Sequence, residues 1–279
     1  MAAPNFFAAE TDLIQRHLEA LLREAFPPPR AELGKFWECM RYSLLSGGKR
    51  FRPVLSLLTA KALGRAVEKA LPMAIAVELI HTYSLIHDDL PMLDNDDERR
   101  GQPTNHKIFG EAQALLAGDA LLTLAFGVLA RASSPHVGEA VAALSQAAGP
   151  QGMVGGQVLD IGDFSLNEDL VTEIHRRKTG DLIRVAVEGA AILLGAGPKD
   201  RESLLQYSNL LGFAFQLADD LQDHDPTKPE RVSYIATAGV EATRARLREV
   251  SDQAVRQLAN LGGAADGLRR MVHFNLERV

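Results

Sequence analysis

Residues 87–101 read HDDLPMLDNDDERRG, and the rest of the chain is organised around this stretch. Six acidic residues crowd together directly after an apolar run, and Arg99 and Arg100 follow them. Two explanations are open, a solvated acidic loop or a bound divalent cation, because carboxylates are the hard oxygen ligands that Mg²⁺ prefers. A calcium loop of the EF-hand type fails, since its glycine position falls on Arg99 and its closing glutamate position on Asn105. A cation shared between protein and substrate phosphates fits better, with the arginines as fork-shaped phosphate donors.

A second polar cluster lies at the end of a helix expected over residues 198–223. Its members follow the spacing i, i+3, i+4 and i+7, and they are Gln216, Asp219, Asp220 and Asp223. This spacing places all four on one helix face. A solvated face is the alternative, but Phe213 and Phe215 lie close by in the sequence. We therefore predict a second site for cations or polar ligands.

Composition restricts the class of protein. The chain has 279 residues, is 46% hydrophobic and rich in Ala and Leu, which favours helix. The net charge of −6 argues against non-specific nucleic-acid binding. Cys39 is the only cysteine, so we expect a core residue and neither an internal disulfide nor a cysteine-based zinc site. We see no signal peptide and no apolar run long enough to span a membrane, and we expect a cytoplasmic protein.

Apolar periodicity and Gly/Pro punctuation predict a single all-α domain over residues 1–279, without strands, linkers or repeats. The expected helices comprise a stripe over 13–22, then 31–46, 53–63, 72–89, 110–132, 137–147, one containing 155–160, one capped by Asn167 with a kink at Gly180 and an end near 194, 198–223, and two or three more that break at Gly262–Gly263.

Three further features bear on chemistry. Residues 47–53 read GGKRFRP, which is either a basic helix terminus or a phosphate clamp. His81, Ser84 and Asp88 share a helix face, and Pro91 breaks that helix, so a loop must bring Asp94 back towards Asp88. The Gly-Gly pair in 155–160 has no Walker pattern, and we read it as close helix packing.

Two carboxylate clusters on apolar helices can face each other across a cavity and hold metal ions against a diphosphate. The metals would make the diphosphate a good leaving group, and apolar walls would shelter the resulting carbocation from water. Lys49, Arg52 and Arg100 lie outside the acidic clusters and could hold a second diphosphate. This arrangement describes the joining of two prenyl diphosphates.

In the motifs described above and over nearly its whole length, the chain resembles the all-trans prenyl diphosphate synthase family. The matching motifs occur in the family's order and are 47–53, 88–94 with 99–101, 178–180, and 215–216 with 219–223. The resemblance implies an all-helical isoprenoid synthase bundle around a central cavity, usually a homodimer without membrane insertion. It implies isopentenyl diphosphate and an allylic diphosphate as substrates. It also implies Mg²⁺ as the cofactor, with three ions bound and with Mn²⁺ as a substitute.

The resemblance also assigns roles to individual positions. Metal ligation or its support falls to Asp88, Asp89, Asp94, Asp219, Asp220 and Asp223. Allylic substrate contacts fall to Arg99, Lys178, Thr179 and Gln216, and isopentenyl diphosphate contacts to Lys49, Arg52, His81 and Arg100. The residues expected to carry catalysis are Asp88, Asp94, Lys178 and Asp219. No side-chain base is nominated, because in the family the released diphosphate is thought to take the proton.

Product length and one departure from the family complete the expectations. Tyr83 and Ser84 occupy the positions that line the floor of the tail pocket in the family, and a bulky Tyr83 resembles bacterial farnesyl diphosphate synthases. We predict a fifteen-carbon product, with geranylgeranyl diphosphate as the alternative. The loop after Asp223 is short, and Arg231 or Lys228 takes the place of the family's lysine there. We expect this shortened loop to affect how the site closes over the substrate. A terpene cyclase and a non-catalytic synthase subunit are less favoured, because the clamp and both aspartate motifs are present.

Overall fold

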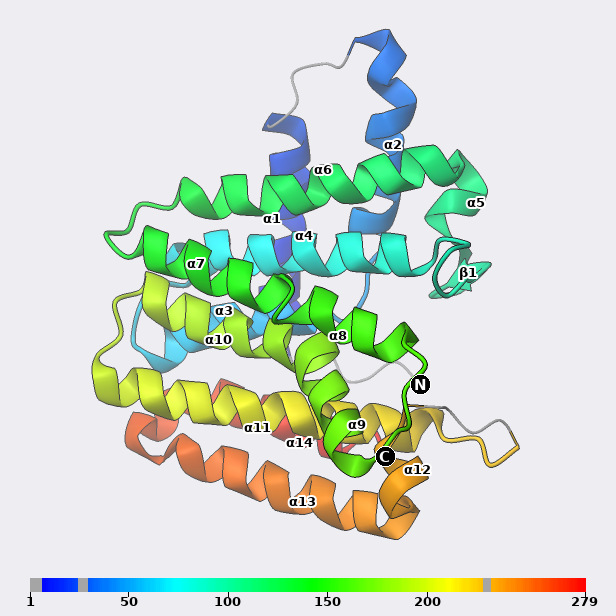
Figure 1. The fold of residues 1–279 in the computed structure, drawn as a ribbon. Helices are drawn as coiled ribbons and strands as arrows, with labels where there is room; N and C mark the ends of the chain where they lie inside the picture. Colours follow the sequence, from blue (N-terminus) through cyan, green and yellow to red (C-terminus); the bar gives the residue numbers. More distant parts are fainter. Residues whose placement is uncertain (1–6, 25–29, 228–231) are drawn as a thin grey trace. The chain divides into compact units, whose positions relative to one another are not determined.

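The structure is a computed structural model that describes residues 7–24, 30–227 and 232–279 (Figure 1). The chain forms two compact units that interleave along the sequence. Unit 1 comprises Met1–Val54 and Leu71–Ala132, and unit 2 comprises Leu55–Ala70 and Ser133–Val279. Each unit is built of helices, as the all-α expectation requires. The single domain over residues 1–279 stays a prediction, and the units are described separately.

Unit 1 is organised around α4, most of whose residues are apolar and buried. Its elements are α1 (Ala8–Glu24), η1 (Ala31–Leu33), α2 (Gly34–Leu45), the first turn of α3 (Phe51–Ala62), α4 (Leu71–Asp88), β1 (Glu98–Arg99), β2 (Gln102–Pro103), α5 (Asn105–Phe109) and α6 (Glu111–Ala130). α4 packs along α6 (Figure 1). Gly118 permits the close approach, because a Cβ there would lie 2.1 Å from Nε2 of His87.

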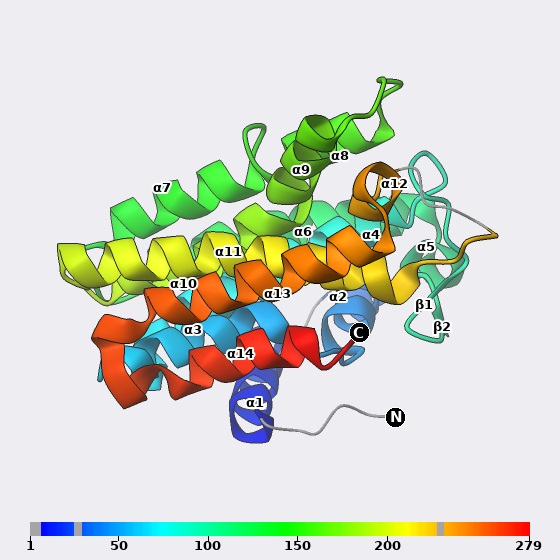
Figure 2. The ribbon, with the colours of Figure 1, turned by 90° about the horizontal axis from the view of Figure 1, so that it is seen from below.

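Unit 2 contains the remaining helices, with α11 packed against α10 and α13 (Figure 2). Its elements are the rest of α3, η2 (Val67–Ala70), α7 (Val137–Ala148), α8 (Met153–Ile161), α9 (Glu168–His175), η3 (Arg176–Gly180), α10 (Asp181–Leu193), α11 (Pro198–Asp223), α12 (Tyr234–Ala238), α13 (Val240–Gln257), η4 (Ala259–Ala265) and α14 (Asp266–Leu276). The packed faces of α10 and α11 form the centre of this unit.

Local sequence signals account for several boundaries. α11 spans the predicted 198–223, because Pro198 begins it with a preset φ. Asn167 caps α9 as predicted, since its side-chain oxygen accepts the backbone N–H of Leu170 at 2.8 Å. Gly262, with φ of +57°, interrupts the final helices at the predicted place.

Between α9 and α10 the chain forms η3, one turn of π-helix that ends at Gly180, the predicted position of the kink. Two expectations need correction. The short hairpin β1–β2 and helix α5 were not predicted, because two-residue strands and a five-residue helix are too short for periodicity to reveal. The expectation that no apolar run could span a membrane was also wrong. Helices α4 and α6 have the length and hydropathy to do so, although 72% of the window containing α4 is buried within the protein.

Candidate active site

The first aspartate cluster is folded back on itself at the end of α4. The backbone N–H of Asp94 donates to the carbonyl of Asp88 at 2.9 Å, which confirms that the loop after Pro91 returns Asp94 to Asp88. Asn95 has a φ of +54°, a left-handed conformation that Asn tolerates and that completes the tight return. Asp88 is half-buried and Asp94 is exposed. The two residues expected to ligate metal therefore lie together in unit 1.

Asp89 has a different environment from its neighbour Asp88. Its carboxylate is buried and accepts a hydrogen bond from Nε of Arg99 at 2.6 Å, while Nη2 of Arg99 reaches Asp96 at 3.2 Å. Burial raises the pKa of Asp89, and the hydrogen bond from Arg99 works against this rise. This pairing favours a supporting role for Asp89, and it holds Arg99 beside the metal-binding loop.

The basic residues of the predicted clamp gather around His81. Nη1 of Arg100 donates to the carbonyl of Gly47 at 2.7 Å, and a Cβ on Gly48 would lie 2.6 Å from that guanidinium. Nη1 of Arg52 lies 3.5 Å from Nε2 of His81. Burial, reinforced by Arg52 and Arg100, holds the pKa of His81 well below 6.5, so the imidazole is neutral at physiological pH. The GGKRFRP stretch therefore brings cations to one place, as a phosphate clamp requires.

A buried ion pair beneath this clamp was not predicted from the sequence. The guanidinium of Arg50 donates to Glu78 of α4, to the carbonyl of Leu44 at 2.8 Å and to Gln15 of α1 at 3.0 Å. The two charged side chains are only 1% and 3% exposed. Arg50 also has a φ of +47°, so its partners must hold the backbone in this uncommon conformation. The pair anchors the clamp to α4, three residues before His81.

Tyr83 and Ser84 lie near the C-terminal end of α4, five and four residues before Asp88. Tyr83 is buried, and its ring meets the ring of His87 edge-on at 5.6 Å. Burial, followed by the charge of Asp88, raises the pKa of Tyr83 to about 12, so the hydroxyl stays protonated. Ser84 donates to the carbonyl of His81 at 2.9 Å. The predicted role of these two residues as a pocket floor stays a prediction.

The second cluster has members with distinct environments at the end of α11. Asp220 is buried and accepts the backbone N–H of Tyr234 at 2.6 Å and an N–H of Gln216 at 3.0 Å. Asp219 is 27% exposed and forms an ion pair with Arg278, whereas Asp223 is exposed. Asp220 thus fixes the start of α12, and Asp219 and Asp223 share one accessible face. Arg231, predicted to contact substrate, and Lys228 lie outside the described residues.

Lys178 has a partner that sequence reasoning missed. Its ammonium lies 2.5 Å from the carboxylate of Asp160 on α8. Gly156 allows this approach, since a Cβ there would lie 2.3 Å from the backbone nitrogen of Lys178, which confirms the expected close helix packing. Gln157 stands three residues before Asp160, and among the described residues neither polar atom of its buried amide has a hydrogen-bond partner. In the sequence, Gln157 and Asp160 lie three residues apart directly after two glycines. This pattern was the signal from which the partner of Lys178 could have been found.

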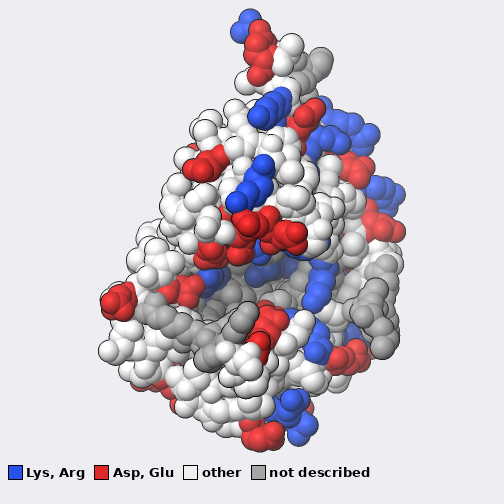
Figure 3. Space-filling model, turned by 90° about the vertical axis from the view of Figure 1, so that its right-hand side faces the viewer, with Lys and Arg blue, Asp and Glu red and all other residues white. Residues whose placement is uncertain are grey.

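The chemistry of the donor set fits Mg²⁺ only if the ion takes further ligands. Among the described residues, no group of three or more His, Cys, Asp or Glu side chains lies together to hold a metal. Each cluster nevertheless offers carboxylate oxygens, from Asp88 with Asp94 and from Asp219 with Asp223. Mg²⁺ suits such sparse sites, because it keeps several waters and completes its shell with substrate phosphates. Figure 3 shows acidic and basic side chains next to each other on the surface.

A helical fold with two aspartate clusters and a separate group of basic residues is the arrangement expected of a prenyltransferase, and the chain's relatives identify it as one. Residues 35–231 match the Polyprenyl synthetase family, and the chain belongs to it.

Individual relatives agree with this assignment. A farnesyl diphosphate synthase of Geobacillus stearothermophilus is 48% identical over 198 residues, which are 68% of this chain and 66% of that protein. One of Micrococcus luteus is 38% identical over 278 residues, 93% of this chain and 94% of the relative. The crystal structure of an FPP/GFPP synthase from Zymomonas mobilis superposes with a TM-score of 0.89 at 36% identity, covering 96% of this chain and 98% of the other. The isoprenoid synthase-type fold is thereby confirmed.

Proposed function

We propose that this prenyltransferase condenses isopentenyl diphosphate with dimethylallyl or geranyl diphosphate and gives mainly farnesyl diphosphate. The observation that carries the proposal is the return of Asp94 to Asp88 in unit 1, together with the clamp of Arg52, His81 and Arg100. It combines a sparse carboxylate site for Mg²⁺ with a separate cationic site for a second diphosphate. Relatives named farnesyl diphosphate synthase support the product.

The chain's residues divide the reaction between two diphosphates. Lys178, Thr179 and Gln216 bind the allylic diphosphate, with Arg99 held beside the first cluster by Asp89. Lys49, Arg52, His81 and Arg100 bind isopentenyl diphosphate, and a neutral His81 accepts or donates one hydrogen bond without adding charge. Apolar helix surfaces exclude water from the carbocation, and Tyr83 closes the tail pocket with Ser84 beside it. The proton leaves with the released diphosphate.

Magnesium is the proposed cofactor, with three ions bound and with Mn²⁺ as a substitute. Asp88, Asp94 and Asp219 would hold the ions, supported by Asp89, Asp220 and Asp223. When bound, the ions neutralise the charge that develops on the departing diphosphate.

A cytoplasmic homodimer is the proposed assembly. Leu115 and Leu116 of α6 are 41% and 52% exposed on a helix of high hydropathy, and a second copy of the chain would cover this face. Light scattering of the purified protein tests the dimer, and a mass of one chain at micromolar concentration would contradict it.

The activity is tested by incubating the purified protein with isopentenyl diphosphate, Mg²⁺ and either dimethylallyl or geranyl diphosphate, and by sizing the products chromatographically. A farnesyl product that EDTA abolishes is the expected result. A twenty-carbon product would retain the chemistry and support the geranylgeranyl diphosphate synthase alternative, which relatives such as that of Cyanophora paradoxa represent at 37% identity. Failure to elongate either starter would contradict the proposal.

A further inference from the structure

The turn that carries Lys178 and Thr179 has an unusual geometry. Residues Arg176–Gly180 form one turn of π-helix, η3, between α9 and α10, and the N–H of Asp181 donates to the carbonyl of Arg176. This is an i to i+5 bond, whereas an α-helix bonds i to i+4. π-Helical turns are rare and store strain, so they persist where the surroundings hold them. The question is what holds this one.

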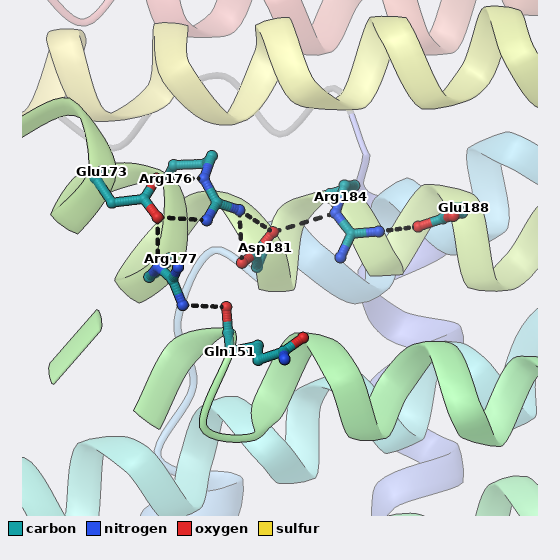
Figure 4. A network of polar contacts seen from close by, with 7 residues as sticks. All are labelled: Gln151, Glu173, Arg176, Arg177, Asp181, Arg184 and Glu188. Atoms are coloured by element: carbon teal, nitrogen blue, oxygen red, sulfur yellow. Dashed lines mark hydrogen bonds and ion pairs between the residues drawn. The ribbon is translucent and has the colours of Figure 1, made fainter. Parts of the chain in front are cut away.

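The side chains of the same two residues are also joined. Nη1 of Arg176 lies 3.2 Å from Oδ2 of Asp181, so an ion pair spans the same five residues as the backbone bond (Figure 4). In a regular α-helix, residues five apart point about 140° away from each other, because each residue turns by about 100°. The pair is therefore compatible with the wide turn and incompatible with a regular one. It favours the π form over the α form.

Neighbouring groups fix the two partners from both sides. Asp181 is only 5% exposed, and its carboxylate also accepts Nε of Arg184 at 3.2 Å. On the other side, Glu173 holds the guanidinium of Arg176 through Nε at 2.7 Å and Nη2 at 2.8 Å (Figure 4). Hydrogen bonding from Arg176 lowers the pKa of Glu173 to about 2, so this acceptor stays charged. The hydrogen bonds and ion pairs thus run without a break from Glu173, before the turn, to Arg184, after it.

The backbone of the turn has little room of its own. A Cβ on Gly212 of α11 would lie 3.0 Å from the Cα of Gly180, and a Cβ on Gly156 of α8 would lie only 2.3 Å from the backbone nitrogen of Lys178. If the turn relaxed to α-helix, the side chains within and after it would rotate relative to these contacts, because an α-helix has fewer residues per turn than a π-helix. Lys178 would then lose the direction that now brings its ammonium to Asp160.

We propose that Arg176 and Asp181 are positioning residues that hold η3 in its π form and thereby orient Lys178 and Thr179 towards the allylic diphosphate. The inference rests on the proposed role of Lys178 and Thr179 in binding that substrate. Neither Arg176 nor Asp181 is among the residues proposed to bind the substrate. Both line a pocket of about 720 Å³ in unit 2, so exchanging them for neutral side chains of similar shape leaves no hole in the apolar core.

The test compares Asp181→Asn, Arg176→Gln and Arg176→Lys with a matched control, Glu188→Gln. The control breaks an ion pair of the same network, Arg184 with Glu188, at ordinary i, i+4 spacing outside the turn. Steady-state kinetics are measured with each substrate varied in turn. We expect Asp181→Asn and Arg176→Gln to lower kcat/KM for the allylic diphosphate about tenfold or more, as small misplacements do, with KM for isopentenyl diphosphate unchanged. Arg176→Lys should recover part of the loss, and the control should match the wild type.

A double-mutant cycle with Lys178→Gln separates positioning from general destabilisation. If Asp181 acts through Lys178, adding Asp181→Asn to Lys178→Gln causes no further loss for the allylic substrate. Additive losses, equal effects on both substrates, or equal behaviour of Asp181→Asn and the control would overturn the inference. Should Asp181→Asn fail to fold, the comparison of Arg176→Gln with Arg176→Lys decides. A Lys178→Gln variant with wild-type kinetics would instead remove the proposed allylic site, and this inference with it.

Discussion

The environment of His81 in the clamp should make the stability of the folded protein depend on pH. Burial and the charges of Arg52 and Arg100 hold its pKa well below 6.5 in the folded protein. In the unfolded chain the imidazole titrates near 6.5. The unfolded state therefore binds a proton that the folded state does not, and the free energy of unfolding falls as pH drops below about 6.5. Above this pH the contribution is fully present.

Replacing His81 by Gln should flatten this dependence. We expect the free energy of unfolding of the wild type to decline more steeply between pH 7.5 and 5.5 than that of His81→Gln, by at most about 1.4 kcal/mol per pH unit for one proton. Denaturant unfolding at several pH values measures the difference. Leu33→Gln, at an exposed position that carries no titrating group, serves as the control and should retain the wild-type slope. Equal slopes for His81→Gln and the wild type would contradict the argument.

Tyr83 is the residue whose size should determine product length. Its buried ring packs edge-on against His87, so truncation removes a wall and leaves space along α4. We expect Tyr83→Ala to shift the products from fifteen towards twenty carbons. Tyr83→Phe is the matched control, because it keeps the ring and removes only the hydroxyl. Chromatography of the dephosphorylated products gives the distribution, and an unchanged distribution in Tyr83→Ala would place the floor elsewhere.

At the scale of elements, the end of α11 carries two aspartates with different roles: Asp220 supports the structure, and Asp219 is proposed to take part in catalysis. Asp220 accepts the backbone N–H of Tyr234 in the interior, and losing it leaves that donor unsatisfied. We expect Asp220→Ala to lower the free energy of unfolding by about 1–3 kcal/mol.

Asp219→Asn should behave in the opposite way. The Asp219–Arg278 pair is partly exposed, and such pairs contribute at most about 1 kcal/mol, so stability should change little. Activity should fall about a hundredfold or more, because a carboxylate proposed to hold the Mg²⁺ that neutralises the departing diphosphate is lost. Thermal unfolding and steady-state rates on both variants test the division. Equal destabilisation by the two substitutions would refute it.

The same elements show what a sequence can predict. Pro198 and the apolar spacing of α11 are local signals, so its bounds and its polar face were predicted correctly. The return of Asp94 followed from a helix broken by Pro91. The π form of η3 could not be predicted, because glycines on two other helices and a network of ion pairs hold it. Asp219 likewise meets Arg278 across 59 residues of sequence, a separation that no periodicity spans.

For the whole molecule, the sparse carboxylates predict that the proposed Mg²⁺ sites fill only together with a diphosphate. Among the described residues, no three ligating side chains lie together, so Mg²⁺ alone finds an incomplete shell and should bind weakly. A diphosphate supplies the missing oxygens and needs the metal to offset its charge beside the aspartates. By linkage, each then raises the affinity for the other.

We therefore expect inorganic pyrophosphate and Mg²⁺ together to raise the melting temperature by more than the sum of their separate effects. Ligand at a hundred times its Kd stabilises the folded state by about 2.7 kcal/mol, which a thermal-shift measurement resolves. EDTA should reverse the combined shift without unfolding the protein, because buried apolar side chains hold the helices of each unit together. Asp219→Asn should weaken the synergy, whereas Leu33→Gln, at an exposed position on η1, should leave it intact. A full shift with Mg²⁺ alone would mean that the protein holds a complete metal site before the substrate arrives.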